Sequence, residues 1–172
     1  MRGAAFGRLL DVLAILVIAF VAYRIFVAPR NLNLSAAHPA PHVQYETLAG
    51  PPFVLTQHRG RLLFLDFYAS WCEPCKISLP MVEHFARSHP EVDVVPVDVG
   101  EPPSVVQAFA KMYKLQNVAI DTPALSRGFF QIDGFPTMVV IDPQSRIRAT
   151  WAGLNPAIQM NMANAEKVLA KN

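Results

Sequence analysis

The two cysteines of the chain, Cys72 and Cys75, are the residues whose type and spacing best support chemistry. They stand three positions apart in the segment WCEPCK (residues 71–76), which follows an apolar run and precedes a helical pattern. On the first turn of a helix, two thiols with this spacing can bond to each other, and the first one faces the unpaired N–H groups of the helix. These groups stabilise a thiolate over a thiol and lower the pKa of Cys72, which favours attack on a disulfide. The pattern therefore predicts thiol–disulfide exchange.

Other roles for a cysteine pair fit this sequence less well. A covalent haem motif requires a histidine after the second cysteine, where this chain has Lys76. A zinc site requires two further ligands, and the chain has no second cysteine pair. A structural disulfide across so short a loop removes little chain entropy. The five histidines do not cluster in the sequence, so a copper site built from both thiols and a distant histidine remains an alternative.

A buried strand and an amphipathic helix are expected to hold the cysteine pair. Residues 61–69 form an apolar run around Asp66, which suits a central parallel strand, and residues 73–88 show helical spacing of apolar side chains. Asn155 is expected as the N-cap of the last helix, with Pro156 at its first position. Further strands are expected at 92–99, 118–120, 137–141 and 147–151, and further helices at 104–113, 123–130 and 157–170. This alternation predicts an α/β sandwich around a mixed sheet.

The sequence around the cysteines resembles the active-site segment of thioredoxins. Residues 65–76 (LDFYASWCEPCK), followed by Pro80, look like the strand, motif and kinked helix of that family, and residues 134–137 (GFPT) look like its cis-proline loop. Gly153 falls where the family has a glycine before its last helix. The long segment between residues 99 and 134, with the apolar N-terminus, resembles the TlpA/ResA-like branch of membrane-tethered thiol-disulfide reductases of the cytochrome c-biogenesis type. The resemblance implies a thioredoxin fold, a central mixed sheet flanked by helices.

The resemblance also implies a substrate-binding surface beside the cysteines. Phe135 and Pro136 are expected to contact the substrate, because a cis-proline exposes the backbone of the preceding residue to an incoming peptide. The incoming peptide can then pair with this backbone like an added strand. Trp71 is expected to line the same surface.

Asp66 is expected to assist proton transfer. A carboxylate in the middle of an apolar strand is costly to bury unpaired, so its pKa should rise. In thioredoxins the acid at this place helps to move a proton to and from the buried second cysteine, here Cys75; a hydrogen-bonded structural acid is the alternative. Many TlpA/ResA-like reductases instead have an acid three residues after that cysteine, where this chain has Ser78. The difference indicates a more thioredoxin-like proton path.

Glu73 and Pro74, which stand between the cysteines, are expected to tune the redox potential. Pro74 has no N–H and stiffens the turn. Glu73 places a negative charge beside Cys72 and opposes its thiolate, which argues against a strong oxidant. A solvated surface glutamate of little consequence is the alternative.

The N-terminal segment holds the longest apolar stretch. Residues 9–27 are apolar apart from Asp11, Tyr23 and Arg24, and a membrane-spanning helix needs about 20 largely apolar residues. A retained anchor is favoured over a cleaved signal peptide, because the small residues 35–37 lie too far beyond the apolar run. We therefore expect an N-terminal transmembrane anchor over 1–30, an extended linker over 31–43 and a thioredoxin-like domain over 44–172. The arginines on both sides of the run leave the orientation undecided.

Length and charge restrict the remaining possibilities. A chain of 172 residues allows one domain plus accessory segments. The formal net charge is +2, and four of the 15 basic residues lie within residues 1–30. The remaining chain is nearly neutral and has no electrostatic footprint for nucleic acid.

These features together predict an exchange reaction outside the cytoplasm. Cys72 is expected to attack a disulfide-bearing protein substrate and Cys75 to resolve the mixed disulfide, with no cofactor. Cytosolic thiols are kept reduced by soluble systems, so a tethered domain is expected on the extracytoplasmic, periplasmic side of a bacterial cytoplasmic membrane, with electrons from a membrane-embedded thiol reductant. The resemblance implies apocytochrome c or another extracytoplasmic protein as the client. A thiol oxidant or isomerase, a copper-delivery module and an anchored interaction domain with incidental cysteines are the alternatives.

Overall fold

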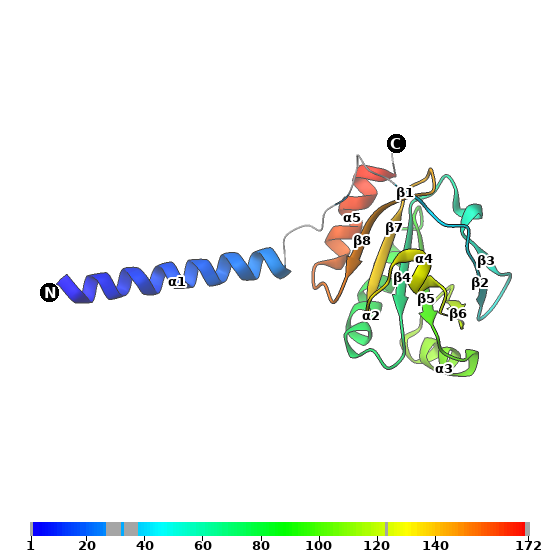
Figure 1. Cartoon of the computed structure of the whole chain (residues 1–172), viewed down its shortest axis with the longest axis horizontal. Helices are drawn as coiled ribbons and strands as arrows, with labels where there is room; N and C mark the ends of the chain where they lie inside the picture. Colours follow the sequence, from blue (N-terminus) through cyan, green and yellow to red (C-terminus); the bar gives the residue numbers. More distant parts are fainter. Residues whose placement is uncertain (1, 27–31, 33–37, 123, 171–172) are drawn as a thin grey trace.

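The computed structural model describes residues 2–26, 32, 38–122 and 124–170, and within the first helix the side chains of residues 8–24. Helices and strands alternate along the chain, as Figure 1 shows. The elements are α1 (Arg2–Phe26), β1 (His38–Pro39), β2 (Gln44–Thr47), β3 (Phe53–Val54), the 3₁₀ turn η1 (Leu55–His58), β4 (Leu63–Tyr68), α2 (Glu73–Ser88), β5 (Asp93–Val99), α3 (Pro103–Tyr113), β6 (Ala119–Asp121), α4 (Ser126–Phe130), β7 (Thr137–Ile141), β8 (Arg146–Ala152) and α5 (Ile158–Leu169).

The strands form one mixed sheet with the order β1-β8-β7-β4-β5-β6-β2-β3. Strand β4 lies near its middle, parallel to β5 and antiparallel to β7. All six residues of β4 are buried, because other layers cover both faces of the sheet at this point. The segment that leaves β4 leads directly into the cysteine pair, so a strand buried along its whole length positions the site.

Side chains of β4 alternate between two cores. Phe64 packs with Val82 and Phe85 of α2 and with Met162 of α5, and Figure 1 shows these two helices side by side. On the other face, apolar side chains pack with the β2–β3 hairpin and the segment around α4; they include Leu63, Leu65, Phe67, Phe53, Phe130 and Ile132. This alternation is the period-2 pattern of a strand buried on both sides.

Two elements beside the site have the bounds that the sequence predicts, whereas β4 is shorter than the expected strand over 61–69. The helix over 73–88 and the strand over 137–141 match residue for residue, and β8 runs antiparallel to β7. The last helix differs, because α5 begins at Ile158 rather than at Pro156. The Oδ1 atom of Asn155 accepts a hydrogen bond from the N–H of Ala157 at 3.0 Å. Asn155 therefore closes a turn before α5, and Pro156 lies in that turn, not at the first helical position.

The N-terminal segment forms helix α1, but the expected transmembrane helix is not confirmed. In the part of the chain that the structure describes, no helix combines the length and hydropathy needed to cross a membrane; Asp11 and Arg24 interrupt the apolar run. Every described side chain of α1 is exposed. Residues 31 and 33–37 of the expected linker, which include the small residues 35–37, lie outside the described residues. The sheet begins before residue 44, because His38 and Pro39 pair with Ile147 and Arg146 of β8.

Candidate active site

The two cysteines form a disulfide at the N-terminus of α2. The sulfur atoms are 2.08 Å apart and the Cα atoms 5.3 Å apart. Cys72 is the N-cap of the helix, and its Sγ accepts a hydrogen bond from the N–H of Cys75 at 3.2 Å. The sulfur of Cys72 therefore faces a backbone donor at the positive end of the helix dipole, which stabilises negative charge on that atom.

The cysteines differ in their surroundings. Cys75 is fully buried and packs among Tyr68, Leu79 and Phe109. Cys72 retains 4 % of its surface and follows Trp71, which is 65 % exposed. A protein substrate can therefore approach Cys72 but not Cys75, which agrees with the order of attack that the sequence predicts.

A carboxylate that the sequence analysis missed holds the loop before the cysteines. Glu101 lies between β5 and α3 and accepts two hydrogen bonds from Ser70, one from its N–H at 2.5 Å and one from its hydroxyl at 2.7 Å. In the sequence, Glu101 stands just after the predicted strand over 92–99, and this position could have marked it as a residue near the site. The paired bonds fix the backbone two residues before Cys72.

Asp98 lies beside Glu101 in the interior and is fully buried. Burial raises the pKa of Asp98 to about 8, and the Glu101 carboxylate contributes to the rise. Asp98 is therefore protonated at neutral pH, which avoids two adjacent negative charges beneath the active-site loop.

Asp66 is buried in β4 and lines a narrow cavity with Ser78 and Pro136. Burial, with a smaller contribution from Glu83, raises the pKa of Asp66 to about 7. The cavity has a volume of about 10 Å³, close to the space that one water molecule needs. Among the described residues no hydrogen bond joins Asp66 to Cys75. The structure thus places Asp66 beside the cis-proline loop.

The cis-proline loop lies against the cysteine segment. The bond between Phe135 and Pro136 is cis, Pro136 is buried, and its carbonyl accepts a hydrogen bond from the N–H of Gly153 at 2.8 Å. Phe135 is half-buried, and its ring meets the ring of Trp71 edge-on with centroids 5.9 Å apart. The structure therefore brings the three residues expected to bind substrate to one surface.

Glu73 and Pro74 occupy the first turn of α2. The Glu73 side chain is 78 % exposed and pairs with the ammonium group of Lys76 at 2.5 Å. Lys76 thus offsets part of the negative charge that Glu73 brings to Cys72. Whether Glu73 and Pro74 set the potential stays a prediction.

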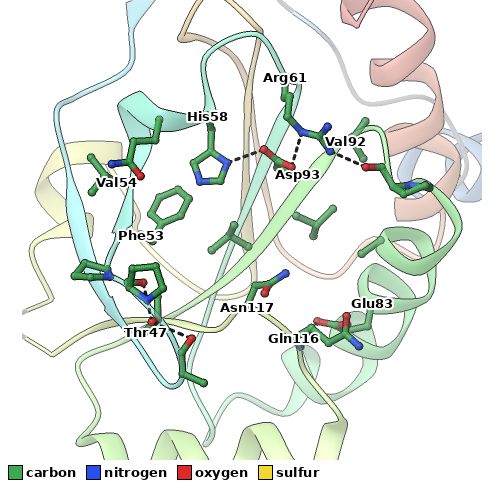
Figure 2. A pocket seen from close by; sticks show the side chains of 18 residues that line it. Thr47, Phe53, Val54, His58, Arg61, Glu83, Val92, Asp93, Gln116 and Asn117 are labelled. Atoms are coloured by element: carbon green, nitrogen blue, oxygen red, sulfur yellow. Dashed lines mark hydrogen bonds and ion pairs between the residues drawn. The ribbon is translucent and has the colours of Figure 1, made fainter.

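The cavity in Figure 2 lies elsewhere and has a volume of about 460 Å³. Asp93 on its wall accepts hydrogen bonds from His58 at 2.6 Å and from Arg61 at 2.7 Å. It pairs in register with Leu63, at the opposite end of β4 from the cysteines. In the described ranges, no group of three or more His, Cys, Asp and Glu side chains is arranged to hold a metal ion. The histidine that a copper site would add to the two thiols is therefore not found beside them in those ranges.

A family model for thioredoxin-like proteins matches residues 60–147, which hold both cysteines and the cis-proline loop. The chain belongs to the thioredoxin-like family. Thiol-disulfide oxidoreductase ResA of Bacillus cereus is 28 % identical to it over 133 residues, 76 % of each chain. The ResA protein of Bacillus subtilis is 30 % identical over 120 residues, 67 % of this chain and 66 % of the relative.

Solved structures agree with this membership. A thiol:disulfide interchange protein of the thioredoxin family from Chlorobium tepidum has a TM-score of 0.68 and 25 % identity, covering 79 % of this chain and 98 % of that one. With the Cys72–Cys75 disulfide, the relatives show that the chain is a thiol-disulfide oxidoreductase of the ResA type. The predicted fold and reaction class are confirmed.

Proposed function

We propose that this oxidoreductase reduces disulfides of extracytoplasmic proteins while attached to a membrane. The observation that carries the proposal is the asymmetry of the cysteine pair: Cys72 caps a helix N-terminus beside the exposed Trp71 and retains 4 % of its surface, whereas Cys75 is fully buried. An accessible attacking sulfur and a protected resolving thiol are what disulfide exchange with a large substrate requires.

The reaction proceeds in two exchanges. The Cys72 thiolate attacks one sulfur of the substrate disulfide, forms a mixed disulfide and releases the other sulfur as a thiolate. The thiolate of Cys75 then attacks Sγ of Cys72, forms the disulfide seen in the structure and releases the second substrate thiolate. Two electrons pass from the enzyme dithiol to the substrate, and both released thiolates take up protons from solvent or neighbouring acids.

Asp66 accepts the proton that Cys75 must lose before it attacks. A pKa of about 7 is suited to this task, because the carboxylate form is well populated at neutral pH and can be protonated easily. The narrow cavity beside Ser78 has room for a bridging water, and Ser78 in turn donates a hydrogen bond to the Cys75 carbonyl at 3.4 Å. A water held in this cavity would lie between Ser78 and Asp66 and pass the proton to the carboxylate.

Substrate binds along the cis-proline loop. The backbone of Phe135 pairs with an extended substrate segment, as an added strand does, while Trp71 covers the segment next to the reacting sulfur. Glu73 and Pro74 keep the potential in the reducing range, because a carboxylate beside Cys72 disfavours the very low cysteine pKa of strong oxidants. A thiol oxidant or isomerase on the same fold is the alternative.

The segments before the domain determine where in the cell the enzyme works. Helix α1 attaches the chain to a bacterial cytoplasmic membrane, since its side chains from Leu9 to Tyr23 are largely apolar and exposed. The segment between α1 and the sheet gives reach, and the thioredoxin-like domain works on the periplasmic side, where disulfides form. A membrane-embedded thiol reductant supplies electrons, and apocytochrome c is one fitting client.

The test uses the reduced full chain and a disulfide-bonded peptide that carries the Cys-x-x-Cys-His pattern of a haem-attachment site. The wild type should release free peptide thiols and form its own disulfide. Cys75→Ser should accumulate a covalent Cys72–peptide adduct visible by mass spectrometry, and Cys72→Ser should form no adduct. Equal adduct formation through Cys75 in the Cys72→Ser protein would contradict the assignment.

A further inference from the structure

Three side chains from different elements meet beside the cysteine pair, and one of them is a cation. Arg127 belongs to α4, a segment outside the strand–cysteine–helix unit. Its Cζ atom lies 5.2 Å from the ring centroid of Phe135 in the cis-proline loop. The Phe135 ring in turn contacts Trp71. The guanidinium therefore borders the surface on which we place the substrate.

The contact with Phe135 holds Arg127 without using its hydrogen-bonding capacity. A guanidinium over an aromatic face is attracted by the ring quadrupole, and all five N–H donors stay available. Arg127 is exposed, and within the ranges that the structure describes its side chain forms no ion pair. A planar fork held in place with unused donors is suited to bind a carboxylate.

The other charges near Cys72 do not serve this purpose. Glu73 pairs with Lys76, so that ammonium group is already engaged. Asp133, two residues before Phe135, is exposed and forms no ion pair with Arg127 in the structure. The guanidinium of Arg127 is thus the cation that an anionic substrate group would meet at the cis-proline loop.

The short helix that carries Arg127 is fixed to the core by Phe130, which is buried. The exposed Leu125 and Phe129 line a separate hollow with Gln44 and Ile120. Arg127 is therefore the side chain of this segment that contacts Phe135.

We propose that Arg127 is a specificity-determining residue that selects client segments with an aspartate or glutamate within a few residues of the reactive cysteine. The inference rests on the proposed function, because it assumes that substrate lies along the cis-proline loop. Arg127 would thus make the rate of exchange depend on the side chains that flank the reactive cysteine of the client.

The test compares peptides of one sequence whose single cysteine is linked to a fluorescent thiol. One peptide of each pair has a glutamate at one of the three positions on either side of the cysteine. The other peptide of the pair has a glutamine at the same position. Reduced full chain, kept reduced with dithiothreitol, is assayed for kcat/KM on each pair. In at least one position the wild type should prefer glutamate about 3- to 10-fold, and this ratio should fall with salt.

Three variants distinguish an effect of Arg127 on the glutamate preference from an effect of the net charge of the protein. Arg127→Gln should bring the ratio to about one, and Arg127→Lys should keep only part of it because an ammonium lacks the planar fork. The matched control is Arg59→Gln, which removes the same charge from an exposed residue before β4, at the end of that strand remote from the cysteines. It should keep the wild-type ratio.

A neutral small disulfide, 2-hydroxyethyl disulfide, tests the exchange activity separately from the specificity role of Arg127. If the wild type does not reduce it, the proposed function itself fails. If Arg127→Gln reduces it at the wild-type rate but keeps the full glutamate preference, or if Arg59→Gln loses the preference equally, the specificity role of Arg127 is wrong. A change in the pH profile of Cys72 alkylation in Arg127→Gln, with equal losses on both peptides, would instead assign Arg127 to thiolate stabilisation and overturn the proposal.

Discussion

Asp66 is a buried carboxylic acid whose pKa differs clearly from its value in water. Its carboxyl group is buried in β4, and burial raises its pKa to about 7. We expect the raised pKa to affect both the proposed proton transfer and the stability of the fold. Each effect can be measured separately on one variant.

Asp66→Asn should slow the resolution of the mixed disulfide by about 100-fold at neutral pH, because it removes the group that accepts the Cys75 proton. Stopped-flow measurement of peptide-thiol release would report this step. Asp98→Asn, at a similarly buried position at the end of β5, is the control and should change the rate little. If Asp66→Asn resolves the mixed disulfide at the wild-type rate, Asp66 does not accept the Cys75 proton.

The same variant should change the pH dependence of stability. Because the folded pKa of Asp66 is raised, the native state binds a proton that the unfolded chain releases above about pH 4. Stability therefore falls as pH rises from about 4 to 7, by up to about 4 kcal/mol from this group. Urea titrations of the oxidised protein should show this loss in the wild type relative to Asp66→Asn. A constant difference between the two proteins across this range would contradict the assigned pKa.

The residues of the site differ in how well the sequence predicts them. Cys72, Cys75 and Pro136 follow from local patterns, because a helix start and a proline turn are encoded by neighbouring residues. Glu101 and Arg127 do not, since each acts on a partner more than five residues away, Ser70 and Phe135. Such contacts depend on how the elements pack.

At the scale of elements, the β7–β8 hairpin is held by one buried carboxylate. Asp142 follows β7 and accepts hydrogen bonds from the N–H groups of Gln144 and Arg146 and from the Nε atoms of Arg146 and Arg148, the last at 2.6 Å. Burial alone would raise the pKa of Asp142, but the hydrogen bonds from Arg146 and Arg148 outweigh it and hold the pKa below its ordinary value.

Asp142→Ala should lower the free energy of unfolding by about 3 kcal/mol at pH 7, because the variant breaks a buried ion pair and its turn. With a lowered folded pKa, this stabilisation is present above about pH 4 and is lost as pH falls through the folded value. Urea titrations at pH 7 and pH 3 should show the difference from wild type shrinking at the lower pH. Asp133→Ala, an exposed loop position, should stay within about 0.5 kcal/mol of wild type. An equal loss in both variants would contradict the role of Asp142.

The elements themselves are predicted well where periodicity is strong and poorly where strands are short. Strand β4 and helix α2 follow from a long apolar run and a clear helical period. Strands β1 and β3 have two residues each, too few to show a period, and β1 pairs with β8, more than 100 residues further along the chain. Asn155 has the residue type of an N-cap, but the turn that it closes delays the start of α5.

At the scale of the whole molecule, α1 and the domain have different surfaces. The described side chains of α1 are exposed, whereas the domain has three clusters of buried apolar side chains. An exposed apolar helix beside a well-packed domain indicates a separate contact for that helix.

The full chain should therefore sediment with vesicles of phosphatidylethanolamine and phosphatidylglycerol. Replacing Leu16 and Ile18 together by glutamate should leave it in the supernatant, because two charges on the apolar surface oppose burial in lipid. The doubly substituted chain should still reduce 2-hydroxyethyl disulfide at the wild-type rate, since α1 is not part of the site. Full chain that stays in the supernatant without substitution would contradict membrane attachment.

The direction of electron flow is the central claim, and the equilibrium reduction potential of the Cys72–Cys75 pair tests it most directly. The full chain would be equilibrated with mixtures of reduced and oxidised dithiothreitol and glutathione, with the fluorescence of Trp71 beside the disulfide as the probe. A reductase is predicted to have a potential near −270 mV or below, about that of thioredoxin. A potential above about −180 mV would contradict the account and indicate an oxidant or isomerase.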